Sequence, residues 1–188
     1  MSLLAALLAL VGCSSLILAP SDSAVQLADP GLDGRRPVEG VLSSATGCSI
    51  HYRLYKPAVA GTSAQASTLV ILGHGFLRSQ ARMAGLAETI AAAGIPVATL
   101  DFCNMRFWDG QHQQNGLDMM ALARHLGGVQ PVIYVGFSAG ALAALVAARN
   151  DPEALGAVTL DLVDAQGIGK RACTSGNHAC QLLNPLQG

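Results

Sequence analysis

Residues 131–140 have the sequence PVIYVGFSAG, and this stretch decides the fold. Its first half, Pro131–Val135, is a short apolar run rich in β-branched residues, as is typical of a buried parallel strand. Residues 139–149 then carry apolar side chains at helical spacing. Between strand and helix, Gly136–Gly140 matches the pattern G-x-S-x-G, in which a sharp, strained turn exposes a serine. We therefore predict a strand–turn–helix unit with Ser138 as a nucleophile at the carboxyl edge of a sheet.

The segments on either side repeat this alternation of strands and helices. We expect strands at 68–72, 96–102 and 157–163, helices at 79–93 and 115–126, and a hairpin formed by Val38–Ser43 and Ser49–Tyr55. On the helix over 115–126, Leu117, Met120 and Ala121 are expected to point inward. The pattern predicts an α/β fold in three layers, with a mostly parallel sheet and an N-terminal antiparallel hairpin.

Composition narrows the class of protein. The chain has 188 residues, which suits one domain, and 51% of them are hydrophobic against 12% charged, which excludes a disordered chain or a coiled coil. Eleven Lys and Arg against twelve Asp and Glu give a formal net charge of −1. Nucleic-acid binders normally carry a basic excess, so no nucleic-acid partner is expected.

The N-terminus has the features of an export signal. The apolar run Leu3–Val11 is too short to span a membrane but fits the core of a signal peptide. Leu10–Cys13 resembles the lipobox of bacterial lipoproteins, although no Lys or Arg precedes the run. This resemblance implies cleavage before Cys13 and acylation of its side chain, with the protein periplasmic or anchored in the outer membrane. Secretion, or an uncleaved anchor that continues through Leu18, remains open.

The chain is thereby divided into three parts. Residues 1–12 are the expected signal peptide, and residues 13–37 form a tether because Pro and Gly interrupt a segment with few apolar residues. Residues 38–188 form the folded domain.

A second motif, Gly73-His74-Gly75-Phe76, directly follows an earlier predicted strand. With both motifs, the chain from about Val38 to Asp164 resembles the α/β-hydrolase superfamily of serine esterases. The resemblance implies that the backbone amides of Phe76 and Ala139 bind the oxyanion of a tetrahedral intermediate. It also implies a structural role for His74, which precedes the nucleophile.

The rest of the catalytic triad should follow Ser138 in the order acid, then histidine. Asp161 lies near the end of the next strand, in an arrangement similar to the branch containing platelet-activating-factor acetylhydrolases and chlorophyllases, and Asp164 is the alternative acid. The only histidine after Asp161 is His178. Either His178 is the general base, or the domain is C-terminally incomplete and lacks the last strands with their histidine.

The cysteines point to disulfides rather than to a metal. Apart from Cys13 there are four, an even number that suggests two bridges in an exported chain. Cys173 and Cys180 are close enough in sequence to close a small loop. The superfamily resemblance implies that Cys48 and Cys103 lie at neighbouring strand ends and pair. No CxxC pair or histidine at zinc-ligand spacing occurs among these cysteines, so we expect no metal and no cofactor.

Three residues of the loop over 104–115 are candidate contacts of the site. The Cys48–Cys103 pairing would bring Phe107 and Trp108 beside the active-site edge, where they either line the substrate pocket or only pack the loop. His112 is expected in the same loop, exposed and near enough to touch a substrate.

Taken together, these residues predict a monomeric, lipid-anchored serine hydrolase that cleaves small or lipid carboxylic esters through an acyl-enzyme on Ser138, or a truncated copy of one. Two alternatives remain open. One is a non-catalytic surface lipoprotein that uses the same fold as a binding module. The other is a peptidase or thioesterase with the same serine turn.

Overall fold

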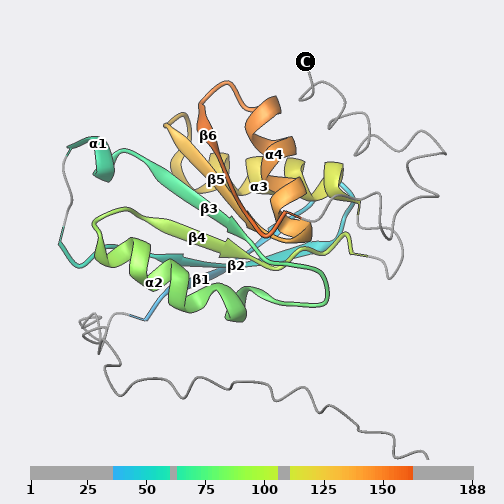
Figure 1. Ribbon diagram of the computed structural model, residues 1–188, viewed down its shortest axis with the longest axis horizontal. Coiled ribbons are helices and arrows are strands. Elements are labelled where there is room, and N and C mark those ends of the chain that lie inside the picture. Colours follow the sequence, from blue (N-terminus) through green and yellow to red (C-terminus); the bar gives the residue numbers. More distant parts are fainter. Residues whose placement is uncertain (1–35, 60–62, 106–110, 163–188) are drawn as a thin grey trace, which may run out of the picture.

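A six-stranded sheet forms the centre of the computed structural model, which describes residues 36–59, 63–105 and 111–162 (Figure 1). The strand order is β1-β2-β4-β3-β5-β6. The strands are β1 Val38–Ser43, β2 Ser49–Tyr55, β3 Leu69–Gly73, β4 Val97–Leu100, β5 Val132–Phe137 and β6 Ala154–Leu160. β1, β2 and β4 pair antiparallel, whereas β4, β3, β5 and β6 run parallel. The carboxyl ends of these four strands therefore lie at one edge of the sheet, where α/β proteins build their sites.

Helices cover both faces of the sheet. They are α1 Ser63–Ala66, the 3₁₀ turn η1 Gln80–Met83, α2 Ala84–Ala92, α3 His112–Gly127 and α4 Ala139–Asn150. Figure 1 shows α2 on one face and α3 with α4 on the other. Met119 and Leu122 of α3 pack with Ala143 of α4 in the core on one side, while Ala87 and Ala91 of α2 pack in the core on the other. The expected three-layer α/β architecture with an N-terminal hairpin is confirmed.

Some element boundaries and one helix face differ from the prediction. The helix expected at 79–93 begins with η1, α3 begins three residues early at His112, and β6 is shifted toward the N-terminus. Leu117 is 39% exposed, so its predicted inward position is wrong. The buried residues of α3 include the predicted Met120 but also Asn115 and Asp118. Hydrogen bonds from other parts of the chain allow the Asp118 carboxylate to be buried there.

The predicted pairing of Cys48 with Cys103 is present. This disulfide joins the end of the hairpin turn to the segment after β4, with 5.9 Å between the Cα atoms. Cys173 and Cys180 lie outside the described residues.

A buried carboxylate lies next to this disulfide. Asp118 is only 1% exposed. It accepts hydrogen bonds from Ser44 Oγ and Asn104 Nδ2, each at 2.7 Å, and from Gln114 Nε2 at 3.1 Å. Its partners come from the hairpin, from the segment after β4 and from α3 itself. Asp118 therefore ties three separate parts of the chain together.

Asp118→Asn should destabilise the fold, because the new amide group would face the donors of Asn104 and Gln114. We expect the free energy of unfolding to fall by about 1–3 kcal/mol in chemical denaturation. Glu153→Gln, at an exposed acid, is the matched control and should stay within about 0.5 kcal/mol of the parent. Equal stability of Asp118→Asn and the parent would show that the cluster does not hold these segments.

Candidate active site

Ser138 occupies a strained turn between β5 and α4. β5 ends at Phe137 and α4 begins at Ala139, so one residue makes the whole reversal. Its backbone angles are φ 53° and ψ −118°, a conformation that costs a non-glycine residue about 1–3 kcal/mol. The Ser138 N–H donates to the carbonyl of Leu160 at 2.8 Å, which fixes the turn to the end of β6. The predicted strand–turn–helix unit is thus present, with Ser138 at the carboxyl edge of the sheet.

The two glycines of the serine motif allow this turn to pack. A β-carbon on Gly136 would overlap the backbone of Gly140, and one on Gly140 would overlap the carbonyl oxygen of His74. Backbone atoms cannot move aside as a flexible side chain can. The start of α4 therefore lies directly on the turn that follows β3, and any side chain at either glycine would push the two apart.

The turn after β3 lies against Ser138. A β-carbon on Gly75 would stand 2.9 Å from the Phe137 ring and 3.2 Å from Ser138 Cβ. Arg78 N–H donates to the Gly75 carbonyl at 3.2 Å, which closes a β-turn with Phe76 and Leu77 at its centre. The fold thus brings the backbone of Phe76, a predicted oxyanion donor, to the same edge as Ser138.

The other predicted donor, Ala139, is the first residue of α4. The N–H groups of a helix's first turn have no acceptor within the helix, and they point toward its N-terminal end. The Ala139 amide therefore lies at the N-terminal end of α4, directly after Ser138.

His74 holds the turn after β3 in place. Its side chain is buried at 2% exposure. Nδ1 lies 2.7 Å from the Gly75 carbonyl and donates to it, while Nε2 accepts the Phe102 N–H at 3.1 Å. The ring also packs on Phe102, with 4.9 Å between centroids. Both ring nitrogens are engaged by backbone, so the geometry fits the structural role expected for His74 and leaves no nitrogen for Ser138.

The imidazole of His74 is neutral in this arrangement. Burial lowers its pKa below the ordinary 6.5. Asp101 Oδ1 is 3.9 Å from Nε2, but Nε2 already accepts a hydrogen bond and carries no proton for an ion pair. Asp101 instead accepts the backbone N–H of Gln80 at 2.7 Å and its side-chain amide at 3.0 Å.

Asp161 follows β6 on the strand next to Ser138. The register pairs Phe137 with Leu160, so Ser138 and Asp161 are the next residues on neighbouring parallel strands. Asp161 is exposed and has a φ of 51°. Main-chain pairing thus places the predicted acid at the same edge as Ser138.

Several other predicted residues lie outside the described part of the chain. These are Cys13, Phe107, Trp108, Asp164 and His178. His112 is described, but as the half-buried first residue of α3 rather than as part of an exposed loop.

Sequence reasoning missed the apolar rim of this edge. Leu77 is 73% exposed, Leu160 37% and Leu162 43%. Leu77 adjoins the glycine–histidine motif, and the two others flank Asp161, but nothing in their spacing marks them as exposed.

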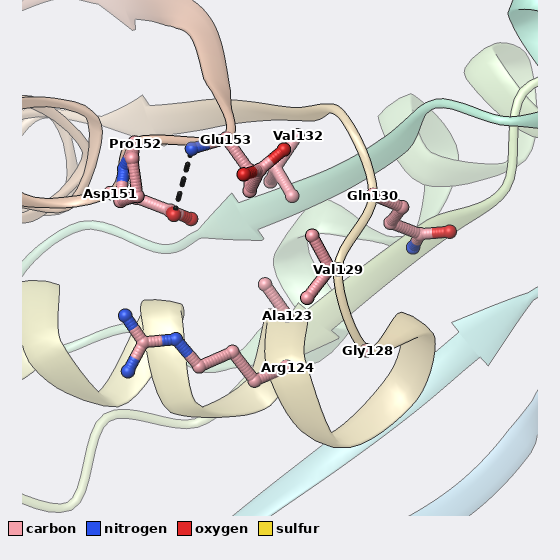
Figure 2. Close-up of a pocket in the computed structure, with 9 residues that line it drawn as sticks. All are labelled: Ala123, Arg124, Gly128, Val129, Gln130, Val132, Asp151, Pro152 and Glu153. Atoms are coloured by element: carbon pink, nitrogen blue, oxygen red, sulfur yellow. Dashed lines mark hydrogen bonds between the residues drawn. The ribbon is translucent and has the colours of Figure 1, made fainter.

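Figure 2 shows a pocket at the opposite edge of the sheet. It is lined by Arg124, Val129 and Asp151 among others, near Val132 at the amino end of β5. Within it Asp151 accepts the Glu153 N–H at 3.2 Å, and the buried Tyr134 hydroxyl also donates to Asp151. None of the predicted site residues lines this pocket. In the described ranges, no group of three or more His, Cys, Asp or Glu could hold a metal ion, and no helix is long and apolar enough to cross a membrane.

The neutral His74 should make stability depend on pH. Below about pH 6.5 the unfolded chain takes up a proton on this side chain while the folded chain does not, so stability should fall as the pH falls toward the lowered pKa. The slope is at most about 1.4 kcal/mol per pH unit. The free energy of unfolding, measured by chemical denaturation at several pH values, should depend less on pH in His74→Gln than in the parent. The control His51→Gln, at an exposed histidine, should keep the parent's pH dependence. Identical slopes for parent and His74→Gln would contradict a neutral buried imidazole.

Comparison with known proteins supports the fold. No protein-family model matches the chain, and no curated protein matches it. Among solved structures, a thermostable carboxyl esterase from Bacillus coagulans has a TM-score of 0.59 at 14% identity, covering 78% of this chain and 51% of that one. A cold-adapted esterase from an Arctic intertidal metagenomic library has a TM-score of 0.55 at 18% identity, covering 72% and 64%. An esterase from Thermogutta terrifontis has a TM-score of 0.52 at 18% identity, covering 70% and 56%.

This chain therefore spans between about half and two thirds of these neighbours' lengths. The strand order, the serine turn and these likenesses agree on one architecture. The described part of the chain has the α/β-hydrolase fold.

Proposed function

We propose that the protein is a serine hydrolase of carboxylic esters, with Ser138 as its nucleophile. The observation that carries this proposal is the strained Ser138 turn, packed against the turn that holds Phe76 and paired through Leu160 with the strand that leads to Asp161. A serine held at positive φ at a sheet edge costs stability. A nucleophile that must be presented to a substrate explains that cost.

The reaction follows from these positions. Ser138 Oγ attacks the ester carbonyl carbon, and the new C–O bond turns the carbonyl oxygen into an oxyanion held by the Phe76 and Ala139 amides. Such donors each contribute about 3–4 kcal/mol to transition-state stabilisation. The alcohol leaves with a proton, and water then releases the acid from Ser138.

A base must take the Ser138 proton, since a free serine is a weak nucleophile. Asp161 is assigned to orient it, ahead of Asp164, because Asp161 directly follows the residue that binds the Ser138 amide. One candidate for the base is His178, the only histidine in the sequence that follows Asp161, which lies outside the described residues. The rival proposal is a truncated copy, in which the catalytic histidine lies outside this sequence.

Esters are favoured as substrates by the fold neighbours. The three neighbours named above are esterases. The Bacillus coagulans enzyme is in complex with glycerol, and the Thermogutta terrifontis enzyme also has a propionate-bound structure. These ligands belong to those proteins. For this chain they support small or lipid carboxylic esters, as in the acetylhydrolase and chlorophyllase branch that the Asp161 position resembles.

The proposal also places the protein at a membrane. Cys13 is the proposed acylation site, residues 1–12 the signal peptide and residues 13–37 the tether of a periplasmic or outer-membrane-anchored monomer. The sequence Leu10–Cys13 supports this location.

Ser138→Ala should abolish hydrolysis of p-nitrophenyl acetate, reducing the rate to that of buffer. Ser49→Ala, at an exposed serine on β2, should leave it unchanged. If the folded parent hydrolyses the ester no faster than buffer, the alternative of a non-catalytic binding module would be favoured. If Ser138→Ala remains active, Ser138 is not the nucleophile.

His178→Ala distinguishes the two proposals for the base. If His178 is the base, the variant should lose most of the rate and keep only the part due to the oxyanion donors and substrate binding. A rate equal to the parent would assign the base elsewhere.

Cys13→Ser should release the protein from membranes, because an acyl chain attached to Cys13 is the proposed anchor. Membrane and soluble fractions of cells that express each form provide the measurement. Retention of Cys13→Ser in the membrane fraction would favour an uncleaved N-terminal anchor.

A further inference from the structure

We infer that Leu77 is a specificity residue that binds an aliphatic chain of the ester substrate. This inference rests on the proposed function and extends it to a substrate class. Three observations carry it: the backbone conformation of Leu77, its exposure, and its place in the turn whose first residue, Gly75, approaches Ser138.

The backbone of Leu77 is strained. Leu77 is the third residue of the Gly75–Arg78 turn and has a φ of 53°. A turn with positive φ at this position favours glycine or asparagine, because a β-carbon crowds the backbone there. A leucine is therefore unfavourable for the turn itself, and its presence requires another explanation.

Packing does not explain it. The Leu77 side chain is 73% exposed, so little of its apolar surface is removed from water in the free protein. A single exposed leucine is ordinary. Here the strained backbone is not offset by burial of the side chain, which fits a side chain whose contacts form only with a ligand.

The position of Leu77 identifies that ligand. Gly75, two residues earlier, would place a β-carbon 3.2 Å from Ser138 Cβ, and the intervening Phe76 supplies a proposed oxyanion amide. The group nearest to Leu77 in a bound ester is therefore a substituent of the carbonyl carbon attacked by Ser138.

A second apolar border lies across the nucleophile. β5, which leads to Ser138, lies between β3 and β6. The end of β6 presents Leu160 at 37% exposure and Leu162 at 43%. Ser138 thus lies between two apolar borders, which suits aliphatic chains and disfavours charged groups on the ester. The chain bound by Leu77 comes either from the acid or from the alcohol half.

The test compares chain-length preference in two substrate series. One pairs p-nitrophenyl octanoate with acetate and varies the acid; the other pairs octyl acetate with ethyl acetate and varies the alcohol. We expect Leu77→Gly and Leu77→Asn to lower the long-to-short ratio of kcat/KM by about fivefold to tenfold in one series, which identifies the half of the ester that Leu77 contacts. Val129→Asn, at an 84% exposed valine of the loop between α3 and β5, is the matched control and should keep both ratios.

Stability separates this role from a structural one. Glycine and asparagine both tolerate a positive φ, so the midpoint of thermal unfolding of Leu77→Gly and Leu77→Asn should equal that of the parent or rise above it. Unchanged ratios in both series, with the fold intact, would overturn the inference.

Measuring the binding of esters to the Ser138→Ala variant tests the role of Leu77 independently of catalysis. In this background, ligand-observed NMR should show tighter binding of octyl acetate or methyl octanoate than of ethyl acetate, and adding Leu77→Gly should remove the preference. If the parent shows no Ser138-dependent turnover but this preference exists, the proposed function fails and the role of Leu77 stands. If binding shows no dependence on Leu77, the inference fails whatever the turnover.

Discussion

The close approach of the start of α4 to the turn after β3 is the constraint on which the site depends. Gly140 lies so near the carbonyl of His74 that no β-carbon fits between them. This contact joins two segments that are far apart in sequence, and each holds one of the proposed oxyanion amides. The strained conformation of Ser138 is maintained from two directions. The turn after β3 packs against the start of α4 on one side, and the Leu160 carbonyl of β6 accepts the Ser138 N–H on the other.

A chain of buried contacts supports this constraint from behind. His74 binds the Gly75 carbonyl with one nitrogen and the Phe102 amide with the other. The next residue, Cys103, is bonded to the hairpin through Cys48. Asp118 ties the same region to α3 through Asn104. The position of the Phe76 amide is thus coupled to the hairpin and to α3.

The parts of this account that could be predicted from sequence are those that backbone geometry imposes. Neighbouring atoms lie so close to the backbone of Gly75, Gly136 and Gly140 that a β-carbon there would overlap or crowd them. The sequence motifs that contain these glycines, together with the strands before them, therefore predicted the position of the Ser138 turn correctly. Apolar periodicity placed Met120 correctly on the buried face of α3 but misplaced Leu117. It could not locate Asp118, because hydrogen bonds rather than apolarity allow that side chain to be buried. Leu77 was missed because its positive φ contradicts the preference of its residue type. The roles of Cys13, Asp161 and His178 stay predictions.

The proposed role of Ser138 is that of a nucleophile, beyond its place in a strained turn. Mass spectrometry of the protein after treatment with a fluorophosphonate tests it directly, since this reagent bonds covalently to activated serines. The account predicts one adduct, found on the peptide that contains Ser138 and missing from Ser138→Ala. No adduct on the folded protein, or an adduct on a different serine, would contradict it.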